Sequence, residues 1–222
     1  MLPKAKNPIF TSQNLTILFS AAFLIILSLL HLLKPELDPS WRMISEYEIG
    51  THGWMMRLAF CCWGLSTFSL VFAIWPACTT RSGKIGRTWL VLIGIALFAA
   101  GMFATNAITD TTVSTADILH KVCGALVILT FPIASSLSIT SLIKNEKWST
   151  NQRPLILIEI LVWLGMCAFF GSIIAARAAH PGVGRVGPEI WSGWPNRLMV
   201  VCYHVWLIAT ALMAKRVALI SI

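Results

Sequence analysis

The chain has 222 residues, of which 57% are hydrophobic and 12% charged, and its mean hydropathy is +0.77. This composition excludes an ordinary soluble domain and places the chain in the membrane class. The formal net charge is +8. The basic residues are spread over several short segments without a stripe of interleaved aromatic residues, which argues against nucleic acid as a partner.

Six apolar segments are long enough to cross a bilayer, because a helix needs about 20 apolar residues to span a hydrocarbon core of about 30 Å. In chain order they are residues 15–33, 54–77, 89–107, 118–143, 155–176 and 198–214. The first is longer than the apolar core of a signal peptide and no small-x-small site follows it, so we expect it to be retained. The sequence predicts one all-α domain, 1–222, built as a bundle of six transmembrane helices.

The loops between these segments predict the orientation of the chain. The side that holds both termini and the second and fourth loops carries ten basic residues against two acidic ones, and the opposite side carries seven of each. Basic residues accumulate on the cytoplasmic side of membrane proteins. We therefore expect both termini in the cytoplasm and a multi-pass protein.

Ionisable residues gather on the opposite, outer side. The second, fourth and sixth segments begin there, and each carries such residues in its first turns: Arg57 on the second, Asp117 and His120 on one face of the fourth, Arg197 and His204 on one face of the sixth. A charge at the bilayer centre costs about 2.5–3.5 kcal/mol. We therefore expect these faces to turn inward around a shared pocket that opens to the outside.

The outer loops are expected to supply the rim of this pocket, with Glu46 and Glu48 from the first loop, Asp110 from the second, and Arg177, His180, Arg185 and Glu189 from the third. The predicted ligand-binding residues are Glu46, His52, Arg57, Asp110, Asp117, His120, Arg197 and His204. The third outer loop, with Arg177, Arg185, Glu189, Trp191 and Trp194, is either an interfacial loop with aromatic belt residues or a lid over the pocket.

Structural interpretations stand beside the functional ones. Arg57 near its helix end is also suited to reach the lipid headgroups, and Asp117 to interact with the helix dipole. His120 and His204 are also consistent with histidines hydrogen-bonded inside the bundle. Glu159, inside the cytoplasmic end, is expected to pair with Arg153 or a neighbouring basic loop. The cysteines are expected to be small apolar fillers, and a Cys123–Cys202 bridge is left open.

Two stretches, "SEYEIGTHGWMMRLAF" and "TNAITDTTVSTADILHKVCGAL", resemble the bacterial six-span membrane proteins catalogued as domain of unknown function 998. The resemblance covers about residues 10–215 and departs from the family in the third outer loop. It implies the fold and the place of the site, and no reaction. Together with the predicted orientation it implies the bacterial cytoplasmic (inner) membrane. The matching positions are Ser45, Glu46, Tyr47, Gly50, Gly53, Arg57, Phe60, Asp110, Thr112 and His120.

Four functions remain in competition. The first is binding of a lipid headgroup or of a small anionic or zwitterionic ligand, with arginines holding phosphate or carboxylate. The second is a metal-dependent membrane hydrolase or transferase at the outer leaflet, with zinc on His52, His120 and His204. The third, haem on two histidines, is disfavoured because His120 and His204 differ in depth. The fourth is an accessory subunit of a membrane protein complex.

Overall fold

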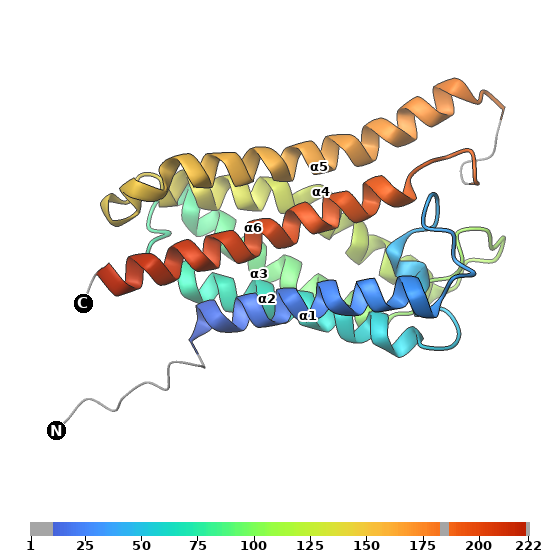
Figure 1. Ribbon diagram of the computed structural model, residues 1–222, viewed down its shortest axis with the longest axis horizontal. Helices are drawn as coiled ribbons and strands as arrows, with labels where there is room; N and C mark the ends of the chain where they lie inside the picture. The colour runs from blue at the N-terminus through green and yellow to red at the C-terminus, as the bar shows by residue number, and fades with distance from the viewer. Residues whose placement is uncertain (1–10, 183–186, 221–222) are drawn as a thin grey trace.

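Six long helices form the structure, a computed structural model that describes residues 11–182 and 187–220 (Figure 1). At 1.5 Å per residue, helices of 22–28 residues measure about 33–42 Å. Each is long and apolar enough to cross a membrane, which confirms the predicted all-α fold with six spans. They are α1 (Ser12–Leu33), α2 (Gly53–Ile74), α3 (Arg81–Met102), α4 (Thr115–Leu142), α5 (Gln152–Ala179) and α6 (Gly193–Ile220), with the 3-10 helices η2 (Ile44–Glu48) and η3 (Glu146–Asn151) between them.

The helix ends follow backbone capping rather than hydropathy. Thr80 Oγ1 accepts a hydrogen bond from the Gly83 amide (3.1 Å), so α3 begins well before the apolar run predicted from residue 89. At its other end α3 stops at Met102, where the backbone of Phe103 turns extended. Residues 103–107, predicted as membrane span, are therefore loop.

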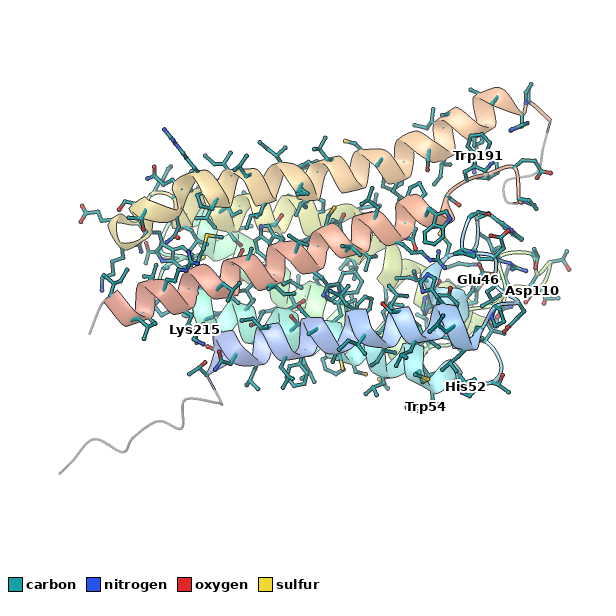
Figure 2. All side chains as sticks on the ribbon, viewed as in Figure 1. Glu46, His52, Trp54, Asp110, Trp191 and Lys215 are labelled. Atoms are coloured by element: carbon teal, nitrogen blue, oxygen red, sulfur yellow. The ribbon has the colours of Figure 1, made fainter. Side chains whose placement is uncertain are left out.

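Helices that are consecutive in the chain lie side by side from α1 to α4, and α6 packs against α1, α2 and α5. The chain enters α1 and leaves α6 at the same end, where Lys215 Nζ donates to Asn14 Oδ1 (3.1 Å; Figure 2). We call this the termini end, and the opposite end, formed by residues 34–52 and 103–114, the loop end. Toward the loop end α5 leans away from the other helices (Figure 1). The assignment of the termini end to the cytoplasm stays a prediction.

The bundle is held by apolar packing without covalent links. Its core contains side chains that are fully buried, among them Phe23, Leu70, Phe131 and Trp206. All six cysteines are free. The structure therefore contains no Cys123–Cys202 bridge.

Candidate functional site at the loop end

Ionisable side chains are buried at the loop end of this otherwise apolar bundle. Glu46, Glu48, Asp117, His120 and Arg197 are each at most 5% exposed. Burial of a charge costs several kcal/mol unless protein partners replace the lost water. The partners of each side chain therefore decide whether it supports the scaffold or can meet a ligand.

Glu46 is bound by protein groups on both carboxylate oxygens. Its Oε1 accepts from Arg42 Nη1 (2.6 Å) and from the Ile108 amide (2.9 Å), and its Oε2 accepts from the Met43 amide (3.0 Å). Glu46 thereby joins the first loop to the loop after α3, in the middle of the loop end (Figure 2). Its charge is compensated inside the protein.

Asp117 fixes the same loop from α4. Its Oδ1 accepts from Thr105 Oγ1 (3.1 Å) and from the Asn106 amide (3.0 Å), and its Oδ2 accepts from Lys121 Nζ (2.6 Å). The Ser114 hydroxyl caps the Asp117 amide and so starts the helix here. Asp117 is therefore a structural anchor as well as an acid at a helix N-terminus.

His120 is oriented by backbone carbonyls at the end of α3. Its Nδ1 lies 3.0 Å from the Ala100 oxygen and 2.9 Å from the Phe103 oxygen, so Nδ1 carries the proton and donates it. The same nitrogen lies 3.6 Å from Glu48 Oε2. In a neutral imidazole the other nitrogen, Nε2, is then an acceptor, and no described residue bonds to it.

Glu48 is the buried carboxyl with the fewest partners at the loop end. Its Oε2 accepts from the Thr105 amide (3.3 Å), whereas its Oε1 has no partner among the residues that the structure describes. Burial raises the pKa of Glu48 from 4.5 to about 7, against the opposing effects of the Thr105 amide and the Arg57 charge. Glu48 lies in η2, outside the spans, and titrates near neutral pH.

Replacing Glu48 with glutamine is expected to flatten the pH dependence of stability. Between about pH 4.5 and 7 the folded protein holds a proton on Glu48 that the unfolded chain has released, so the free energy of unfolding falls as pH rises, by about 3 kcal/mol. Above pH 7 the variant should be more stable than the parent. Unfolding in detergent at a series of pH values measures this, with the exposed Glu36→Gln as control; equal slopes in parent and Glu48→Gln would contradict it.

Arg197 is surrounded by protein acceptors from distant parts of the chain. Its Nε donates to His31 Nε2 (2.7 Å), its Nη2 to Tyr47 Oη (3.0 Å), and its Nη1 to the carbonyl oxygens of Arg42 (2.7 Å), Gly193 (3.0 Å) and Pro39 (3.3 Å). Its guanidinium thus links α6 to α1 and to the first loop. With its donors bound in this way, Arg197 belongs to the scaffold of the loop end.

Three of the predicted ligand-binding residues lie at the exposed margin. His52 caps α2 in the left-handed region (φ 63°) and is exposed, as are Arg57 and Asp110 (Figure 2 labels His52 and Asp110). Asp110 accepts from the Ala107 amide (3.1 Å) within its own turn. Of the three, only Arg57 acts on a buried group of the loop end, since its charge opposes the rise in the pKa of Glu48.

His204 lies apart from the loop-end groups, in the aromatic core. It is fully buried, its ring stacks on Phe23 at 4.2 Å between centroids, and Trp63 lies at 5.0 Å. Neither ring nitrogen has a partner in the described part of the chain. Among residues 11–182 and 187–220, no group of three or more His, Cys, Asp or Glu side chains is placed to hold a metal ion. The structure thus does not bring His52, His120 and His204 together as zinc ligands.

The third outer loop is only partly described, and Arg185 lies outside the described residues. Trp191 is 59% exposed (Figure 2) and Glu189 is also exposed. The loop is attached to the first loop, since the Gly193 amide donates to the Ser40 oxygen (3.0 Å).

A cavity of about 360 Å³ lies beneath the loop end, between α2, α3, α4, α5 and α6. Of the predicted ligand-binding residues, Glu46 and His120 line it. Ala125 and Leu129 of α4 also line it and are exposed on the outer surface of the bundle. Its polar lining residues are Ser45, Glu46, Thr105, Asn106, His120, Lys121 and Asn196, and its apolar ones include Phe60, Trp63, Leu97, Val127, Ile128, Phe169, Phe170 and Val200.

Sequence reasoning singled out Glu46 and His120 because both are ionisable. It missed Asn196, which accepts from the Ile44 amide (3.3 Å), and the aromatic pair Phe169 and Phe170. An apolar residue that lines a cavity reads in the sequence like any other membrane-span residue, so no signal marked Phe169 and Phe170. Asn196 stands at the start of an apolar helix, which is a weak signal.

The model of a family described as "Protein of unknown function (DUF998)" matches residues 17–213, which is most of the chain. No curated protein and no solved structure matches it.

Proposed function

We propose that this chain, which belongs to the DUF998 family, binds a membrane lipid by taking one apolar chain of the lipid into the cavity and holding its polar head at the loop end. The observation that carries the proposal is the division of the cavity lining. Aromatic and aliphatic side chains line its membrane part, and its polar lining residues gather toward the loop end, where Met43, Ile44 and Ile108 also line it. Binding sites of this kind are mostly apolar with a few polar groups that fix orientation.

The size and position of the cavity favour a single chain of a lipid. A volume of 360 Å³ corresponds to about twelve water-sized groups at about 30 Å³ each, too few for a whole two-chain lipid. Because Ala125 and Leu129 line the cavity and are also exposed on α4, a chain can enter from the surrounding bilayer. The rest of the lipid would stay in the membrane.

The polar side chains that line the cavity limit which lipid headgroups it can bind. Glu46 is compensated by Arg42, and Lys121 is paired with Asp117, so the lining carries no surplus charge. Arg197, expected from the sequence to hold phosphate, is engaged by protein acceptors. The half-exposed Lys121 ammonium can still donate a hydrogen bond to a ligand, and the His120 Nε2 can accept one. These groups suit a zwitterionic or uncharged polar head better than a strongly anionic one.

With the termini end in the cytoplasm, the lipid would come from the outer leaflet of a bacterial inner membrane. The described His, Cys, Asp and Glu side chains form no metal-binding group, so lipid binding is proposed in preference to a metal-dependent hydrolase.

The test fills the cavity without disturbing the bundle. A Cβ added at Gly124, which lines the cavity, meets nothing within 4 Å, and the same holds at Gly171 of α5, which lies outside the lining. We expect Gly124→Leu to lower lipid retention about tenfold, the effect of displacing roughly two buried methylene groups. Gly171→Leu is the matched control and should retain lipid like the parent.

Native mass spectrometry of protein extracted in mild detergent measures the retention. Parent protein that carries no lipid, or equal lipid in parent and Gly124→Leu, would refute the proposal. Size-exclusion profiles of both variants establish that the bundle is folded.

A further inference from the structure

A second polar cluster lies inside the membrane span, nearer the termini end than the cavity. Glu159 of α5 is half-buried, and its Oε1 accepts from the hydroxyls of Ser135 (2.9 Å) and Ser136 (2.6 Å) of α4. The ion pairs of the described residues do not include Glu159. The expected pairing with Arg153 is therefore replaced by hydrogen bonds between two helices.

Polar groups from three helices surround Glu159, and no basic side chain of the described residues pairs with it. Trp163 Nε1 of α5 donates to Ser136 Oγ (3.0 Å). From α6, Trp206 and Tyr203 face Glu159. Of these two side chains, only the Tyr203 hydroxyl can ionise. Glu159 Oε2 and Trp206 Nε1 are buried without a partner that meets hydrogen-bond geometry among the described residues. An ionisable residue inside a span marks a functional site by default.

The Ser135 hydroxyl can donate its hydrogen bond to either of two acceptors. The cluster can therefore stay hydrogen-bonded whether Glu159 is ionised or protonated. Its oxygen lies 2.9 Å from Glu159 Oε1 and 3.0 Å from the Pro132 carbonyl oxygen, while a hydroxyl has one proton to donate. When Glu159 is ionised, Ser135 donates to it. When Glu159 is protonated, it donates to Ser135 Oγ, and Ser135 donates to the Pro132 oxygen.

The backbone of α4 around Pro132 is arranged so that Ser135 can change its hydrogen-bond acceptor. Pro132 has no amide proton, so the Ile128 carbonyl lacks its usual helical donor, and Tyr203 Oη of α6 donates to it instead (3.0 Å). The hydrogen bond that α4 lacks at Pro132 is thus replaced by one from α6, while the Pro132 oxygen accepts from Ser135. Ile128 also lines the cavity, so the cluster adjoins it.

We propose that Glu159 is a reversible proton-binding site inside the membrane span, with Ser135 as the hydroxyl that turns between Glu159 and the Pro132 carbonyl. The site is independent of the proposed lipid function, since Glu159 does not line the cavity. Its ligand is the proton itself.

Infrared difference spectroscopy of the full-length protein in lipid vesicles tests this, comparing samples from about pH 5 to about pH 9. All samples carry Glu48→Gln, which removes the loop-end carboxyl that titrates in the same range, and this protein is the parent in the comparisons that follow. The parent protein should show the carbonyl stretch of a protonated carboxylic acid that disappears as pH rises. Glu159→Gln should lose this band completely. Ser135→Ala should keep it at a shifted frequency, and Ser138→Ala, whose hydroxyl bonds to the Ala134 oxygen, should leave it unchanged.

Labelling with the hydrophobic reagent dicyclohexylcarbodiimide is the second readout. The protonated carboxyl adds across a C=N bond: its oxygen bonds to the central carbon, its proton goes to nitrogen, and nothing leaves. The adduct should map to Glu159 and be absent in Glu159→Gln. A band and an adduct that persist in Glu159→Gln, or a parent protein without either at any pH tested, would overturn the proposal. Lipid retention in Glu159→Gln, measured as above, separates this outcome from a failure of the lipid proposal.

Discussion

Replacement of Arg197 by leucine is expected to destabilise the protein by about 3–5 kcal/mol, the range seen when one member of a buried polar network is removed. Leucine fills part of the space but leaves unpaired acceptors on the first loop and on α1, among them the Arg42 oxygen, Tyr47 Oη and His31 Nε2. Each buried unsatisfied group costs about 1–3 kcal/mol. Arg197→Lys should be intermediate, because its ammonium cannot reproduce the planar fork.

Arg57 provides the control for Arg197. It is exposed, so Arg57→Leu should change the free energy of unfolding by about 0.5 kcal/mol or less. Chemical unfolding of the purified variants in detergent micelles gives both values. If Arg197→Leu proved as stable as Arg57→Leu, Arg197 would be free to bind a ligand as the sequence suggested.

Removal of the Asp117 carboxylate by Asp117→Ala is expected to cost about 2–4 kcal/mol and to release the loop after α3. The Asn106 amide and Thr105 hydroxyl lose their acceptor, and Lys121 loses its ion pair. Because the Thr105 amide also binds Glu48, the loosening should spread toward η2. Hydrogen exchange of the peptide that covers residues 103–112 should accelerate.

Asp110→Ala is the matched control, since Asp110 is an exposed aspartate of the same loop that accepts from the Ala107 amide. Its exchange pattern should resemble that of the parent outside its own turn. Identical exchange in Asp117→Ala and Asp110→Ala would show that Asp117 does not anchor the loop.

These expectations separate two kinds of ionisable residue at the loop end. Glu46, Asp117 and Arg197 hold the loops on the helices through bonds to backbone groups and side chains. His120 and Lys121 keep unused hydrogen-bonding capacity at the cavity. In the proposed lipid site, the first set holds the loops over the cavity, and the second set contacts the lipid headgroup.

The sequence by itself determined the number of spans, the fold class and the end of the bundle at which ionisable groups gather. These properties are sums over local residues, because hydropathy over about 20 positions predicts a span. It also selected Glu46 and His120, which line the cavity.

The tertiary structure decided which ionisable groups are left for a ligand. Arg197 and His31 are separated by 166 positions and yet share a hydrogen bond, and Asp117 binds the backbone of a loop that the hydropathy pattern placed within a span. His204 shares a helix face with Arg197 but stacks on Phe23 in the core. Side-chain partners depend on how each helix is rotated and on where the loops cross, which the local pattern of residues does not specify.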